Sequence, residues 1–106
     1  YVAAYPGAEH SIVCVDGEPV GRLIVWESEH GLRLIDIALL PAVRGRGIGA
    51  ALLEALQQRA RAIRRPLRLQ VTPENPALRL YRRLGFTERW STATGIELEW
   101  IPGDGR

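Results

Sequence analysis

The sequence of 106 residues contains no lysine, no methionine and one cysteine, and none of its apolar runs is long. The single Cys14 excludes an internal disulfide framework, and we expect it to be a small buried side chain in a protein of the reducing cytoplasm. No apolar run approaches the roughly 20 residues of a membrane-spanning helix, and no basic-then-apolar secretion signal opens the chain. We therefore expect no membrane partner. The absence of methionine indicates that the native start lies outside this sequence.

What the chain does contain is ordinary for one globular domain. Hydrophobic residues make up 46% and charged residues 25% of it, which excludes a disordered tail, a collagen-like fibre and a disulfide scaffold. Domains commonly run to about 100–150 residues. We therefore expect a single domain over residues 1–106.

The net charge of +2 conceals an uneven distribution. Residues 44–89 hold eleven arginines and three glutamates, a net charge of +8, whereas residues 1–43 carry −4 and residues 90–106 carry −2. Such asymmetry indicates a polyanionic partner. By charge alone, nucleic acid, a membrane surface and a phosphorylated cofactor would all qualify.

Hydrophobic periodicity predicts six strands and two helices. The strands are expected at 11–16, 20–26, 32–40, 67–72, 86–90 and 96–101, and the helices at 47–64 and 75–85. Strand 32–40 is apolar on both faces, as in a buried central strand. The order β-β-β-α-β-α-β-β predicts an α/β (α+β) fold in which helices pack on one mixed sheet.

The most informative segment joins the third predicted strand to the first helix and carries Gly45, Gly47 and Gly49. Glycine lets the chain turn tightly and lets a ligand approach the backbone. Free amides at a helix start bind anions, and Arg44 and Arg46 could add charge-assisted bonds to phosphate. The segment lacks the Gly-Lys-Ser/Thr of a P-loop, and its spacing differs from the G-x-G-x-x-G dinucleotide fingerprint. It predicts an anion site of another type.

This loop resembles the pyrophosphate-binding motif of the GNAT superfamily of acyl-CoA-dependent N-acetyltransferases, written Q/R-x-x-G-x-G/A. Arg44, Gly47 and Gly49 match that pattern. The hairpin sequence Asp-Gly-Glu-Pro-Val-Gly at 16–21 is also familiar in the family. The resemblance covers about residues 11–101.

The stretch from Asn75 to Phe86 is similar to a second signature of the family, N-x-x-A-x-x-L-Y-x-x-x-G-F. Asn75 lies one residue closer to Tyr81 than the signature asks, so that a strict count places Glu74 at the asparagine position. Asn75 nevertheless suits a helix cap, since its side chain can accept from free amides.

The resemblance implies a mostly antiparallel sheet with a splayed V at its central strands, where acetyl-CoA would lie as co-substrate. It implies transfer of the acetyl group to a primary amine of a small molecule or peptide by direct attack, without a metal. Tyr81 corresponds to the general acid that protonates the departing thiolate. The cofactor-binding residues that it implies are Ile37, Ala38, Leu39, Arg44, Gly45, Arg46, Gly47, Ile48, Gly49, Ala50 and Asn75.

Several alternatives stay open. Some relatives carry a glutamate base where this chain has Gln70, which leaves Asp36, Glu74 or a chain of waters as the base. The strand and two helices that normally open the family are missing before Ser11, so that an uncovered sheet edge could pair in a homodimer. Arg59, Arg61, Arg64 and Arg65 are assigned to a solvated helix face or to the 3′-phosphate of CoA.

Two other functions compete with an acetyltransferase. A non-catalytic acyl-CoA-binding module would share the fold and bind CoA without turnover. A nucleic-acid-binding domain would use the arginine-rich middle of the chain, but no aromatic stacking surface accompanies those arginines in the sequence. We therefore expect no nucleic-acid partner.

Overall fold

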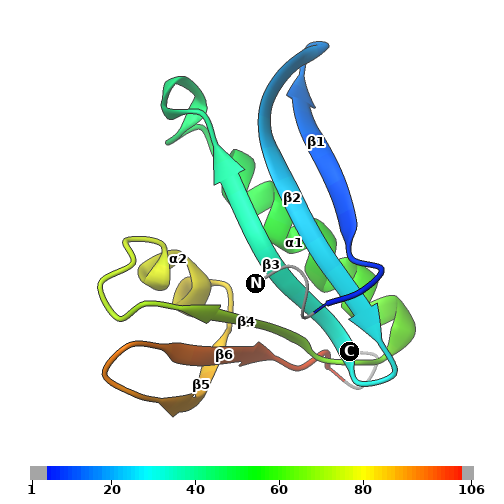
Figure 1. The fold of residues 1–106 in the computed structure, drawn as a ribbon, viewed down its shortest axis with the longest axis vertical. Coiled ribbons are helices and arrows are strands. Elements are labelled where there is room, and N and C mark those ends of the chain that lie inside the picture. The colour runs from blue at the N-terminus through cyan, green and yellow to red at the C-terminus, as the bar shows by residue number, and fades with distance from the viewer. Residues whose placement is uncertain (1–4, 104–106) are drawn as a thin grey trace.

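Six strands form one sheet in the order β1-β2-β3-β4-β6-β5 in the computed structural model, which describes residues 5–103 (Figure 1). The outermost residues of the predicted domain, 1–4 and 104–106, lie outside the described part. The strands are β1 (Glu9–Val15), β2 (Glu18–Ser28), β3 (Gly31–Leu39), β4 (Leu67–Val71), β5 (Thr87–Ser91) and β6 (Ile96–Trp100). The helices are α1 (Ile48–Ile63) and α2 (Leu78–Arg83), with a short 3-10 helix η2 at Pro41–Val43. The predicted order of elements is confirmed.

The sheet splits at its centre. β3 pairs with β4 in parallel through only three residue pairs, Leu32–Leu34 against Leu67–Leu69. All other neighbouring strands pair antiparallel. Beyond the short ladder β3 runs on to Leu39 and β4 to Val71, and the two strands diverge into a V (Figure 1). The predicted splay of the central strands is confirmed.

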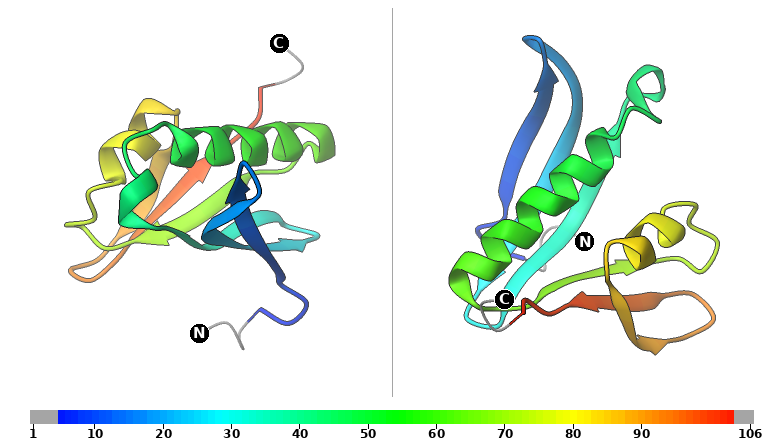
Figure 2. Two further views of the ribbon diagram at one scale, coloured as in Figure 1. Left: turned by 90° about the horizontal axis from the view of Figure 1, so that it is seen from above. Right: turned by 180° about the vertical axis from the view of Figure 1, so that it is seen from behind.

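Both helices lie on one side of the sheet (Figure 2). The apolar stripe of α1 packs its Leu53, Leu56 and Ala60 side chains into the core beside leucines of β3, β4 and β6. Five leucines are the largest fully buried side chains, namely Leu32, Leu53, Leu67, Leu69 and Leu98. Burying a leucine contributes about 1.5–3 kcal/mol, so this layer holds the two arms of the V in place.

The second helix begins later than the sequence indicates. The Asn75 side-chain oxygen accepts from the Ala77 N–H at 2.8 Å. This bond does not cap the helix as predicted, because it holds Pro76 and Ala77 in a turn and α2 starts only at Leu78. The Gln57 side-chain amide, from α1, donates to the Leu84 carbonyl at 2.8 Å and ties the end of α2 to the core.

The edge strand β1 corrects one expectation. Cys14 is exposed rather than buried, and Ile12 on the same strand is 68% exposed. β1 pairs only with β2, and none of the described helices covers it, so apolar side chains there remain in solvent. The prediction of a buried thiol was wrong because apolar sequence alone does not distinguish an edge strand from a central one.

The face of the sheet opposite the helices carries ion pairs. Arg33 donates two hydrogen bonds to the Glu97 carboxylate, at 2.8 and 2.9 Å, and Arg68 donates to Glu99 at 2.7 Å. Arg89 lies within 3.5 Å of Glu99. No helix in residues 5–103 is both long and apolar enough to cross a membrane.

Candidate active site

A cleft of about 710 Å³ opens where the end of β3, the glycine loop, the start of α1 and α2 meet. Ten of the twelve predicted site residues line it. They are Ile37, Ala38, Leu39, Arg44, Gly45, Gly47, Ile48, Gly49, Ala50 and Tyr81. The cleft also contains six residues that were not among the predicted site residues, namely Val43, Leu53, Pro76, Ala77, Leu80 and Arg83. Ala77 and Leu80 occupy the alanine and leucine positions of the Tyr81 signature, whereas Leu53 and Val43 are buried apolar side chains in α1 and η2 that no motif marks.

The glycine loop presents backbone amides to the cleft. Gly45 and Gly47 adopt φ values of 79° and 80°, in the left-handed region. The first intrahelical bond of α1 runs from the Ala51 N–H to the Gly47 carbonyl at 3.0 Å. The three preceding amides, those of residues 48–50, therefore have no acceptor within the helix. Together with the helix dipole they form a site for an anion such as a pyrophosphate.

The two arginines of the loop differ in position. The Arg44 Nε donates to the Leu39 carbonyl at 3.1 Å and fastens the loop to the end of β3. Arg44 lines the cleft, and its guanidinium retains further donors for an anion. Arg46 is exposed and does not line the cleft. Only Arg44 of the pair is therefore positioned against the cleft.

Tyr81 is the buried polar group of the cleft. Its side chain, on α2, is 5% exposed and packs edge-on against Phe86, with ring centroids 5.7 Å apart. Burial raises the pKa of the Tyr81 phenol above its ordinary value near 10. Within residues 5–103 the hydroxyl forms no hydrogen bond, so it is a protonated donor free to act on a ligand.

Comparison with known proteins decides the family. The model of the acetyltransferase (GNAT) domain matches residues 6–88, most of the chain. This chain belongs to the GNAT family. The resemblance seen in the glycine loop and the Tyr81 signature is thereby confirmed.

Relatives of this GNAT domain carry varied names. It is 41% identical over 58 residues to mycothiol acetyltransferase of Amycolatopsis mediterranei (strain U-32), matching 53% of this chain and 19% of that protein. The chain thus spans about a fifth of the length of that curated relative. The ribosomal-protein-S18-alanine N-acetyltransferase of Escherichia coli superposes with a TM-score of 0.79 and 25% identity, covering 94% of this chain and 73% of that one.

A third similar structure contains the coenzyme. The PaiA N-acetyltransferase of Thermoplasma acidophilum, in complex with coenzyme A, gives a TM-score of 0.78 at 18% identity, covering 89% of this chain and 60% of that one. At this identity the likeness establishes the fold alone. The predicted fold class, a mixed and mostly antiparallel GNAT sheet, is confirmed.

The remaining predicted residues of the GNAT domain lie outside the cleft. Asn75 does not line it, and its side-chain oxygen is engaged by the Ala77 amide. Its contribution is to position Pro76 and Ala77, which do line the cleft. Asn75 is therefore a support of the wall in this structure rather than part of its surface.

The candidate bases do not line the cleft either. Asp36 neighbours Ile37 on β3, so its side chain faces the opposite side of the sheet, where its carboxylate bonds Arg22 at 2.5 Å. Glu74 is exposed in the loop before α2. Gln70 packs over Gly95, where an added Cβ would lie 2.6 Å from the Gln70 amide nitrogen. Of the two carboxylates, Asp36 alone sits on a strand that forms the V.

In the part of the chain that the structure describes, no group of three or more His, Cys, Asp or Glu side chains is close enough to hold an ion. The cleft itself is lined by backbone, apolar and arginine groups. Its chemistry fits a phosphorylated organic ligand.

Proposed function

We propose that this GNAT domain transfers an acetyl group from acetyl-CoA to a primary amine of a small molecule or peptide. The observation that carries the proposal is the convergence of the amide-lined glycine loop and the buried Tyr81 hydroxyl on one cleft. The names of the relatives support the reaction type, because each is an acetyltransferase. A cytoplasmic location is part of the same proposal and is compatible with the unpaired Cys14.

Binding would use two parts of the cleft. The amides of residues 48–50 and the Arg44 guanidinium are suited to the pyrophosphate. Beyond the short β3–β4 ladder, the backbone of Ile37, Ala38 and Leu39 has no β4 neighbour. It can pair with the amide groups of the pantetheine arm as with an added strand.

The transfer step would depend on two proton movements. The acceptor amine must be neutral to attack the thioester, and its proton must pass to a base or to water. Asp36 lies on the far side of β3 from the cleft. Its carboxylate is suited to accept the proton of an amine that approaches from the helix-free face, provided that its ion pair with Arg22 opens. The departing thiolate requires a proton, which the Tyr81 phenol can supply from α2.

The test measures acetyl transfer directly. The purified chain is mixed with acetyl-CoA and a panel that includes an alanine-initiated peptide and simple primary amines, and acetylated product is detected by mass spectrometry. Counting released thiol requires a Cys14→Ser background, because Cys14 is exposed. We expect product with at least one amine. CoA binding without product from any acceptor would instead favour the non-catalytic acyl-CoA-binding module.

The glycine loop provides a matched pair of variants. Gly47→Ala is expected to weaken CoA binding by about tenfold or more, because a left-handed φ costs an alanine roughly 1–2 kcal/mol and its relief would turn the amides away. Gly17 has the same φ, 81° against 80°, and an added Cβ meets nothing within 4 Å at either position.

Gly17→Ala is therefore the control, since it carries equal backbone strain in the β1–β2 turn. Isothermal titration with CoA measures both variants. Equal loss of affinity in the two would show that strain, rather than the loop amides, limits binding.

A further inference from the structure

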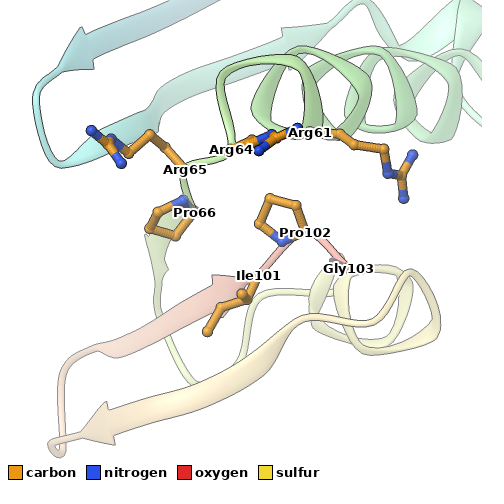
Figure 3. Close-up of a pocket in the computed structure, with 7 residues that line it drawn as sticks. All are labelled: Arg61, Arg64, Arg65, Pro66, Ile101, Pro102 and Gly103. Carbon is orange, nitrogen blue, oxygen red and sulfur yellow. The ribbon is translucent and has the colours of Figure 1, made fainter. Parts of the chain in front are cut away.

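A second hollow, of about 500 Å³, lies at the other end of α1 (Figure 3). It is lined by Arg61, Arg64, Arg65, Pro66, Ile101, Pro102 and Gly103. α1 has 16 residues, and at a rise of about 1.5 Å per residue the hollow is roughly 24 Å from the glycine loop. It shares no lining residue with the cleft. This distance separates the three arginines from any phosphate held at the loop.

The hollow holds unpaired positive charge. Its three arginines have no carboxylate among the lining residues, and their guanidinium groups form no hydrogen bond or ion pair within residues 5–103. Arg61 instead lies over the Trp100 ring, 5.3 Å from its centroid. Elsewhere in the described chain, arginines do pair with carboxylates, namely Arg22, Arg33, Arg59, Arg68 and Arg89.

One of these arginines, Arg64, is fixed in an unfavourable backbone conformation. Arg64 adopts φ 56° and ψ 44°, a position usually taken by glycine after a helix. The Arg65 N–H donates to the Ala60 carbonyl at 3.1 Å and the Arg64 N–H to the Arg61 carbonyl at 3.2 Å, which closes the helix end. The Leu32 N–H donates to the Pro66 carbonyl at 3.0 Å and anchors the segment to β3.

Keeping an arginine rather than a glycine in this conformation carries a cost in backbone strain. Strained non-glycine residues cluster at functional sites. The cost and the absence of a carboxylate partner both indicate that the side chain of Arg64 serves an external ligand.

The shape of the hollow selects the ligand. The Arg61 and Arg65 side chains extend toward opposite sides of the hollow (Figure 3), so their charges are spread out rather than focused on one phosphate. Between them lie the apolar surfaces of Pro66, Ile101 and Pro102, and Ile101 is 66% exposed. We propose that this hollow docks an acidic polypeptide segment, with an apolar side chain against the prolines and its carboxylates on the arginines.

Nucleic acid fits the same surface less well. Single-stranded binding needs free aromatic rings for base stacking, and the Trp100 ring is covered by Arg61. The other unpaired arginines include Arg79 and Arg82 on α2, and the two views place α2 away from the C-terminal end of α1 (Figures 1 and 2). A continuous basic track for a phosphate backbone is therefore lacking in the described residues.

The test uses fluorescence anisotropy with a labelled acidic peptide that carries a central leucine. The full chain is expected to bind it at low salt and to lose about tenfold or more in affinity when Arg64→Gly is introduced. Arg64→Gly should also raise the melting temperature, because it relieves the left-handed strain. Arg79→Ala, which removes the same charge from an exposed position on α2, is the control and should leave peptide affinity unchanged.

Two further ligands test the proposal, namely the same peptide with serine in place of its central leucine and a single-stranded oligonucleotide. Replacing the central leucine by serine should weaken binding severalfold, since the apolar wall loses its partner. Absence of peptide binding, an equal loss in Arg79→Ala, or tighter binding of a single-stranded oligonucleotide of equal charge would each overturn the proposal. CoA affinity, measured in parallel, should be the same in all variants, which separates this result from the proposed acetyl transfer.

Discussion

Replacing Tyr81 by phenylalanine is expected to lower kcat for acetyl transfer by about 100- to 10,000-fold, the range typical of a lost general acid. The ring of Tyr81 packs against Phe86 within the core, and phenylalanine preserves that contact. CoA affinity and the melting temperature should therefore change little. Steady-state kinetics, calorimetric titration with CoA and thermal unfolding measure the three quantities.

The pH dependence separates a proton donor from a merely structural tyrosine. Because burial raises the pKa of Tyr81, the phenol stays protonated through the neutral range and loses its proton only above about pH 10. The native rate should fall on that alkaline side, and the fall should be missing from the residual rate of Tyr81→Phe. An unchanged kcat in the variant would show that Tyr81 is not the general acid of the reaction.

Replacing Glu97 by alanine should destabilise the fold by about 3–5 kcal/mol, because it leaves a buried guanidinium without its counter-ion. The side chains of Arg33 and Glu97 are 17% and 5% exposed, and the Arg33 Nε already has no partner in the described residues. The hydrogen bonds from Arg33 to Glu97 raise the pKa of that guanidinium, so it cannot escape the loss by giving up its proton. Denaturant unfolding should show a midpoint well below that of the native chain.

The double variant Arg33→Met with Glu97→Leu is the matched control. Replacing both members of a buried ion pair by apolar groups is often neutral or stabilising, so most of the lost stability should return. If the double variant is as unstable as Glu97→Ala, the loss of stability comes from altered packing at the site and not from the unpaired charge.

Local patterns in the sequence predicted the elements and the cleft. Apolar spacing located α1 within one residue at each end, because its buried stripe repeats at the helical period. Three glycines and Arg44 identified the loop, because the conformational freedom of glycine and the charge of arginine are properties of single residues that the sequence shows directly. Tyr81 was located by its signature, and its burial beside Phe86 agrees with the apolar spacing of Ala77, Leu80 and Tyr81 along the second helix.

Contacts between distant residues were not predictable. Arg33 and Glu97 are separated by 64 positions, and Arg59, assigned to a solvated helix face, bonds Glu9 and Glu27 at 2.6 and 2.7 Å. No local pattern encodes such partners, because strand order decides which side chains meet. The predicted helix cap at Asn75 was wrong for another reason, since its side-chain amide can equally cap a helix or hold a turn, and only packing chooses between them.

The three-pair ladder between β3 and β4 has a mechanical consequence. A continuous sheet has two edges, whereas this one has two more along the inner sides of its V. The arms are therefore joined by a short hinge of hydrogen bonds and by α1, which packs on both β3 and β4. The separation of the arms is set by the helix, and a ligand chain that pairs with β3 would restore bonds that the sheet itself leaves unmade. Affinity for such a ligand and rigidity of the fold are thus coupled through the same row of backbone groups.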